Sequence, residues 1–316
     1  MPSITVYRSS DPGAPTLTKS AGSFIAVLDA CLRTGYGSKA GAGWTKPYTG
    51  TNTAVFRQGT GGQNRCVRVV NGAVDVSHNY AAAWARGYES MTAVSTGTGP
   101  FPTAAQANSN GVYSAYINVN EPGSTNWIVR ANSNWFDIVT DLAPTTESPW
   151  NSSSYLAFGE FQSLKSGDTY SQYLYGGHPN VPGNAAYLGG SAPFNLFIAR
   201  SDTGAAGSIL ATALPMFPGE YYYLGFSNST LFPSGGGSVT NRASSTTFMH
   251  RHFIMDGGVV RGILPGLWGI PAGVAEIGRD TTFSGSGDLA GRTFWTTGYF
   301  AGMAPIILEV SNTLDD

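Results

Sequence analysis

The residues best placed to do chemistry are two histidines that stand two positions apart. His250 and His252 flank Arg251, and on a β-strand residues i and i+2 face the same side. Copied around a three-fold axis, this pair could supply imidazole ligands to an octahedral metal ion. No third ligand stands beside the pair, so a polar strand face with extended basic side chains is the competing interpretation.

Acidic residues that neighbour aromatic ones suggest a second kind of chemistry. Hydrolysis of a glycosidic bond needs two carboxyl groups placed across a sugar, and adjacent aromatic rings could form a platform for that sugar. The candidate acids are Asp137, Glu147, Glu160, Asp168 and Glu220. The chain has 19 acidic residues, so some of them adjoin an aromatic residue by chance, and the pattern favours no particular pair.

Aromatic residues could also bind carbohydrate without catalysis. The candidates lie in the second half of the chain, and they are Trp150, Tyr170, Tyr173, Tyr175, Tyr221 and Tyr223. The competing interpretation is packing in the core or at a subunit interface, because aromatic side chains dominate both.

The sequence lacks the signatures of common catalytic sites. It has no Gly-x-Ser-x-Gly elbow before a helix, no Walker A loop and no glycine motif in a dinucleotide-binding context. The spaced acids of a calcium loop are also missing. Cys31 and Cys66 are isolated, which predicts two reduced and buried thiols. These observations predict a protein that is not an enzyme and that has no cofactor.

The elements that would position these residues are predicted to be mostly β-strands. Charged residues make up only 11% of the chain, against about 25% in an ordinary soluble domain, and 42 Gly and 18 Pro interrupt it. One helix is predicted over residues 24–32, with Ser20 or Ser23 at its start and Gly35 just past its end. The predicted fold is mostly β, a β-sandwich or irregular barrel with long loops and one short N-terminal helix.

Predicted strands are short and separated by turn-forming residues. Segments 54–57 and 66–70 form a hairpin around the glycine-rich loop 59–64, and 127–130 and 135–139 form another. Further strands are predicted over 113–120, 155–161, 169–175, 194–199, 221–226, 247–255, 259–264, 292–296 and 306–310. Two long loops, 143–153 and 176–193, are expected to contact a partner or a neighbouring part of the protein.

Composition also argues against nucleic acid and membrane as partners. The net charge is −2, without the basic excess of a nucleic-acid-binding protein. No segment approaches the ~18 apolar residues of a membrane helix, and the N-terminus lacks the features of a signal peptide. We therefore expect a protein made in a cytoplasm that contacts neither nucleic acid nor membrane. A surface with so few charges suits a subunit that packs against neighbours.

Several sequence segments are similar to those of one group of proteins. They are Gly35-Tyr36-Gly37-Ser38-Lys39, Gly43-Trp44-Thr45-Lys46-Pro47-Tyr48, Asn52-Thr53-Ala54-Val55-Phe56-Arg57-Gln58-Gly59, Arg86-Gly87-Tyr88-Glu89, Gly97-Thr98-Gly99-Pro100-Phe101-Pro102 and Val260-Arg261-Gly262-Ile263-Leu264-Pro265-Gly266-Leu267. Through them the chain resembles uncharacterised virion structural proteins of tailed bacteriophages, mainly over residues 1–105 and more thinly over 255–300. These segments are turn and strand patterns and mark no catalytic site.

The resemblance implies a non-enzymatic virion component of the capsid, neck, tail or baseplate, made in the host bacterial cytoplasm. Its partners would be other copies of itself and other virion proteins. On this interpretation an N-terminal region, 1–105, docks onto the particle and a β-rich region, 106–316, follows it, unless the two form a single domain. One alternative is a receptor- or carbohydrate-binding module for a host surface glycan. Another is a polysaccharide-degrading tailspike, against which the uneven strand spacing argues.

Overall fold

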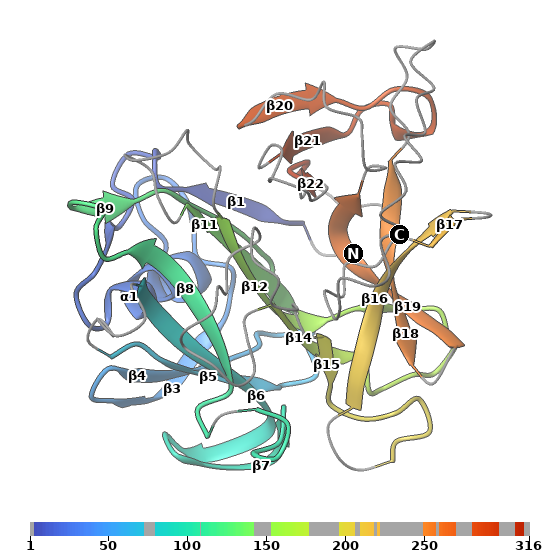
Figure 1. Cartoon of the computed structure of the whole chain (residues 1–316), viewed down its shortest axis with the longest axis horizontal. Helices are drawn as coiled ribbons and strands as arrows, with labels where there is room; N and C mark the ends of the chain where they lie inside the picture. The colour runs from blue at the N-terminus through green and yellow to red at the C-terminus, as the bar shows by residue number, and fades with distance from the viewer. Residues whose placement is uncertain are drawn as a thin grey trace.

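The chain folds into antiparallel β-sheets, as a computed structural model shows (Figure 1). The structure describes residues 3–72, 80–107, 109–141, 153–176, 196–205, 209–217, 220–221, 249–256, 259–269, 280–296 and 307–312. Only the backbone is described for 209–217, 220–221, 250 and 269. The predicted mostly β fold with one short N-terminal helix is confirmed, and the described strands form no closed barrel.

A six-stranded sheet is formed by strands that lie between residues 45 and 118. Its order is β3-β4-β5-β6-β7, and β8 pairs with the other end of the long strand β6. The strands are β3 (Thr45–Gly50), β4 (Thr53–Arg57), β5 (Cys66–Val70), β6 (Tyr80–Ala93), β7 (Thr96–Phe101) and β8 (Val112–Asn118). The predicted hairpin around loop 59–64 is confirmed as β4 and β5.

The larger sheet has fourteen strands, and its main order is β1-β10-β11-β12-β14-β15-β16-β18-β19-β22-β21-β20. Its first half consists of β1 (Thr5–Arg8), β10 (Trp127–Ala131), β11 (Trp135–Asp141), β12 (Ser153–Glu160), β14 (Gln172–Gly176) and β15 (Leu196–Ile198). Its second half consists of β16 (Ile209–Phe217), β18 (His250–Asp256), β19 (Val259–Gly269), β20 (Thr281–Ser284), β21 (Thr293–Thr296) and β22 (Ile307–Glu309).

Short elements complete this arrangement. Strand β13 (Gln162–Ser163) directly follows β12 and pairs with β19, which fastens the second half of the large sheet to the first. Strand β17 (Glu220–Tyr221) pairs with β16. A separate pair joins β2 (Leu17–Thr18) to β9 (Ser124–Thr125), and a 3₁₀ turn η3 spans Gly287–Leu289.

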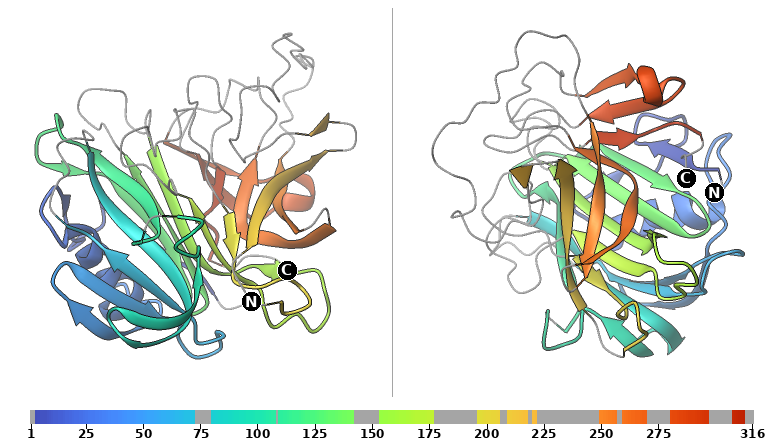
Figure 2. Two further views of the ribbon diagram at one scale, coloured as in Figure 1. Left: turned by 60° about the horizontal axis from the view of Figure 1, so that its bottom comes forward. Right: turned by 90° about the vertical axis from the view of Figure 1, so that its right-hand side faces the viewer.

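Two hydrophobic cores lie on opposite faces of β10, β11, β12 and β14, which we call the central strands. On one face Phe136 packs with Phe56 of the six-stranded sheet and Phe24 of the helix. On the other face Tyr155 packs with Trp295 and other side chains of the C-terminal strands. All of β11, and all of β12 except its last residue, is therefore buried. The structure is a sandwich with three layers, in which the central strands are covered on both sides (Figure 2).

The helix lies in the first of these cores. Helix α1 (Ser23–Asp29) continues into a π-helical turn η1 (Ala30–Thr34), and Gly35 ends it with a φ of 75°. A positive φ is a conformation that glycine adopts readily, as the sequence predicted for this position. The helix residues buried in the core are Phe24, Val27, Leu28, Cys31 and Leu32, which lie within the predicted range 24–32, and Ile25 is partly buried beside them.

The start of the helix differs from the prediction. Neither Ser20 nor Ser23 caps it, because the N-cap position is Gly22 and no side chain from the cap bonds the helix. The cap comes from a distant residue instead. The buried side chain of Asn71 accepts a hydrogen bond from the Phe24 N–H at 2.9 Å, and its main-chain oxygen accepts one from Gly22 N–H at 2.9 Å.

Backbone pairing crosses the predicted boundary at residue 105. Strand β1 pairs with β10, β2 with β9, and β8 with β6. Residues 1–105 therefore share sheets with later segments, and docking by this region stays a prediction. No helix in the described part of the chain is long and apolar enough to span a membrane.

Candidate functional site

The histidine pair lies on β18, where the strand is irregular. His252 is buried and pairs in register with Pro215 of β16, while the side chain of His250 lies outside the described residues. The register between β18 and β19 shifts between Arg251 and Phe253. Within the described ranges no group of three or more His, Cys, Asp or Glu side chains could hold a metal ion. The metal site at His250 and His252 stays a prediction.

The aromatic candidates divide between the core and the surface. Tyr173 and Tyr175 of β14 are buried in the second core, and burial raises the pKa of both phenols. Tyr170 is half-buried, and the guanidinium carbon of Arg200 lies 5.7 Å from the centre of its ring. Only the backbone of Tyr221 is described. Trp150 and Tyr223 lie outside the described residues. Tyr173 and Tyr175 therefore act as packing residues in this chain.

Asp137 lies on β11 beside Arg130 of β10, and both are fully buried. Arg130 donates to both carboxylate oxygens of Asp137, and Tyr155 donates to one of them at 3.1 Å. Arg130 also donates to the main-chain oxygens of Gly266 at 2.6 Å and Glu309 at 2.8 Å. The pair therefore ties the central strands to β19 and β22, and Asp137 has no access to a substrate from solvent.

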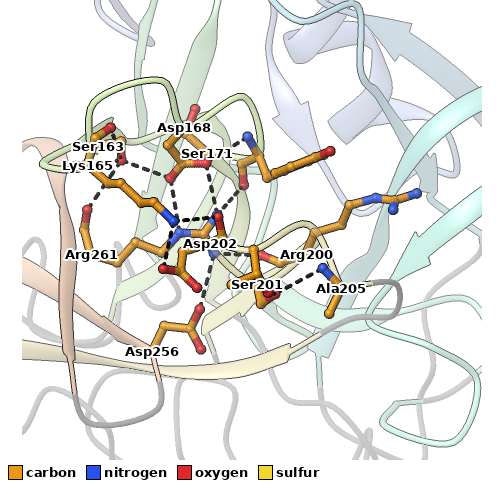
Figure 3. A network of polar contacts seen from close by, with 12 residues as sticks. Ser163, Lys165, Asp168, Ser171, Arg200, Ser201, Asp202, Ala205, Asp256 and Arg261 are labelled. Carbon is orange, nitrogen blue, oxygen red and sulfur yellow. Dashed lines mark hydrogen bonds and ion pairs between the residues drawn. The ribbon is translucent and has the colours of Figure 1, made fainter.

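Asp168 belongs to a polar network between the central and C-terminal strands (Figure 3). Arg261 of β19 donates to both oxygens of Asp168, at 3.0 and 3.1 Å, in a bidentate pair. Ser163 and the Tyr170 N–H also donate to this carboxylate, each at 2.8 Å. Burial alone would raise the pKa of Asp168, but these hydrogen bonds outweigh it and hold the pKa below its ordinary value.

The same network extends to the six-stranded sheet. Arg261 donates to the main-chain oxygen of Arg200, which follows β15, and to Asp256 at 3.3 Å. The Arg200 side chain in turn forms a bidentate pair with Glu89 of β6. Hydrogen bonds from Arg200 lower the pKa of Glu89. Three parts of the fold, β6, the central strands and β19, are thus linked by arginine–carboxylate pairs.

Glu160 differs from the other two candidate acids whose side chains are described. It ends β12, is half-buried, and has no basic side chain within ion-pair distance in the described residues. It accepts a hydrogen bond of 2.6 Å from the N–H of Gln63, in the loop between β4 and β5. Burial raises the pKa of Glu160, although Gln172, Gln58 and the charge of Arg65 act in the opposite direction.

The candidate acids whose side chains are described supply no paired acid and base. Glu147 lies outside the described residues, and only the backbone of Glu220 is described. Asp137 and Asp168 each face a guanidinium rather than a second carboxyl group. Glu160 contacts the backbone of a loop. The described geometry therefore brings together charge pairs that join strands, and not two carboxyl groups across a sugar.

Sequence reasoning overlooked the arginines that organise these pairs. Arg130 follows Trp-Ile-Val and Arg261 precedes Gly-Ile-Leu, so each stands inside an apolar strand. Because a buried charge requires a partner, such an arginine in a chain with few charges signals a buried ion pair. No protein-family model matches the chain, and no curated protein matches it.

Proposed function

We propose that the protein is a non-enzymatic structural component of a tailed-phage virion that assembles in multiple copies. The observation that carries the proposal is the use of Asp137 and Asp168 in bidentate arginine pairs that join separate strands. Hydrogen bonds hold the pKa of Asp168 below its ordinary value, which makes this carboxylate poorly suited to donate a proton near neutral pH. Asp137 is buried, and both of its oxygens accept hydrogen bonds from Arg130. Such pairs are well suited to hold layers of a particle subunit in register.

Composition and sequence similarity support the same function. Interface cores are depleted in charged residues and enriched in aromatic ones, and this chain combines 11% charged residues with 12% aromatic residues. The resemblance to virion structural proteins rests on residues 1–105 and 255–300. We further propose that the protein is located in the capsid, neck, tail or baseplate of the particle, and that it docks there through residues 1–105.

The test is to image particles that carry the full chain with a small tag at an exposed loop. We expect density for several copies around a symmetry axis, and the purified protein should release no reducing sugar from host surface polysaccharide. Particles that lack the protein would contradict the proposal. Sugar release that is lost in both Glu160→Gln and Asp168→Asn would instead identify a tailspike, and binding to a glycan array without hydrolysis would identify a receptor-binding module.

Deleting residues 1–40 is not a clean test of docking. This segment contains β1 and α1, and Phe24, Val27 and Leu28 lie in the main core. The truncated chain would lose part of its core and is expected to misfold before it meets a particle. Substitutions at exposed positions of the same region, such as Ala26 on α1, leave the core intact and are the better choice.

A further inference from the structure

The outer face of the six-stranded sheet carries three arginines on neighbouring strands. Arg68 of β5 pairs in register with Arg86 of β6 on one side and with Val55 of β4 on the other. Arg57 of β4 pairs with Cys66, two residues before Arg68. Directly opposed residues, and residues two apart, point to one face of a sheet. Arg57, Arg68 and Arg86 therefore share the face opposite the main core.

The floor of this face is apolar and partly aromatic. Val55, Cys66, Tyr88 and Met91 are buried there and form one cluster, against which the half-buried Tyr48 packs. We call the set Tyr48, Arg57 and Arg68, which are all half-buried, the arginine face. Tyrosine and arginine are residue types that are enriched where proteins bind one another. The composition of this face thus resembles a binding surface more than an ordinary solvated one.

The charges of Arg57 and Arg68 are not balanced by described acids. Arg68 donates to the amide oxygen of Asn110 at 3.2 Å, and Arg57 donates to the main-chain oxygen of Met91 at 3.4 Å. Both acceptors are neutral, and no described carboxylate lies within ion-pair distance of either guanidinium. The Nε of Arg68 is buried and has no acceptor among the described residues.

Several other described arginines are arranged differently, although Arg65 likewise donates to a neutral main-chain oxygen, that of Glu89 at 3.2 Å. Each of these five pairs with a carboxylate: Arg33, Arg130, Arg200, Arg261 and Arg292. Arg86 is nine-tenths buried and has an interaction of its own within the chain. Like charges placed directly opposite each other on a sheet are destabilising. A carboxylate that approaches the end of the Arg68 guanidinium from outside would offset this repulsion.

We propose that the arginine face binds carboxylate groups on another protein chain. Diagonal neighbours on adjacent strands lie about 7–8 Å apart, so the long side chains of Arg57 and Arg68 can converge on one acidic side chain. A guanidinium fork matches a carboxylate in a bidentate manner, and the half-buried Tyr48 would pack against the apolar part of the same partner. The site is a property of the folded chain and does not depend on the proposed virion function.

The test measures binding of a labelled hexaglutamate peptide with an amidated C-terminus to the full chain, by fluorescence polarisation. A hexaglutamine peptide of equal length is the neutral control. We expect the acidic peptide to bind and the neutral one not to bind. Arg57→Gln and Arg68→Gln should each weaken binding at least about tenfold, because each removes charge-assisted hydrogen bonds. Arg68→Lys should give an intermediate affinity, since it keeps the charge but loses the fork.

The matched control is Arg33→Gln, which removes one positive charge from an arginine that already pairs with Asp29. It should change the affinity less than about twofold, a small effect typical of an exposed pair. Circular dichroism establishes that each variant is folded, and Arg68→Lys keeps the test valid if Arg68→Gln is not. The proposal would be overturned if Arg57→Gln and Arg68→Lys both bound the acidic peptide with the same affinity as the native chain. Binding of inorganic phosphate without any binding of the acidic peptide would also overturn it, and would identify a site for small anions.

Discussion

The pair Arg130–Asp137 shows how single residues hold the layers together. Arg130 reaches Asp137 within the central strands and the main-chain oxygens of Gly266 and Glu309 outside them. A buried ion pair gains little over an apolar pair of the same shape, because desolvation offsets the attraction. Its hydrogen bonds to carbonyl oxygens are directional, however, so it fixes how the C-terminal strands sit on the central ones.

Substituting Asp137 by Asn should be strongly destabilising. The change leaves the Arg130 guanidinium buried beside a neutral amide, and an uncompensated buried charge costs about 3–5 kcal/mol. We expect the free energy of unfolding in urea to fall by this amount. Asp202→Asn is the matched control, since Asp202 pairs with Lys165 at 3.0 Å and both side chains are about half exposed. That change should have little effect on the free energy of unfolding, because an exposed pair contributes little. Equal effects of the two substitutions would refute the structural role of Arg130–Asp137.

At the scale of elements, the loop between β4 and β5 shows how a hairpin of the six-stranded sheet docks on the central strands. The N–H of Gln63 donates to Glu160, and the Gln63 side chain donates to Ser171 at 3.1 Å. Gly59 N–H donates to the main-chain oxygen of Ser133 at 2.9 Å. A side chain at Gly59 would approach the main-chain oxygen of Gly43 to 2.3 Å, which explains why glycine is needed at this contact.

The attachment of this loop should depend on pH through Glu160. Burial raises the pKa of Glu160 above its ordinary value of 4.5, so the folded chain holds the proton more tightly than the unfolded chain. The resulting stabilisation is complete below the unfolded pKa and is lost as the pH rises through the folded one. The melting temperature of Glu160→Gln should therefore increase relative to that of the native protein between pH 4 and pH 8.

The control for this pH dependence is Glu89→Gln, for which the sign is reversed. Hydrogen bonds from Arg200 lower the pKa of Glu89, so its contribution to stability is present above the unfolded pKa and is lost as the pH falls. Glu89→Gln should be less stable than the native protein at neutral pH, and the difference should shrink on acidification. Parallel melting curves for native protein and Glu160→Gln across this range would show that Glu160 is not perturbed by burial.

Elements with a local signal could be predicted from the sequence, and elements that depend on distant partners could not. The hairpin of β10 and β11 has short alternating strands around the turn 131–134, and it was predicted at nearly its observed bounds. Asn71 is followed by Gly72, and this dipeptide is by itself only a turn signal. Its role as helix cap, with further hydrogen bonds to Ala82 and Tyr116, appears only after segments far apart in the chain have packed.

At the scale of the whole molecule, central strands covered on both faces explain the unusual composition. Strands buried on both sides need nearly continuous apolar side chains, and β11 and β12 have little room for charge. The side chains of the candidate acids Asp137 and Asp168 are buried, and each is paired with a buried arginine. Their burial could have been inferred from apolar strand neighbours, whereas the identity of their partners depended on the order of strands in the sheet.

This use of charge predicts self-association near the isoelectric point. The chain has only 36 charged side chains, and some of them pair with one another inside the fold, such as Arg130–Asp137 and Arg261–Asp168, which leaves a weak field around the molecule. Light scattering by the purified protein should be strongest near pH 6.1, where the net charge is zero. Replacing the exposed Thr92 and Thr96 by Glu adds two negative charges and should move this maximum to lower pH. If the protein were a monodisperse monomer at pH 6.1 and at concentrations of milligrams per millilitre, its low charge would not promote assembly, and the prediction would be wrong.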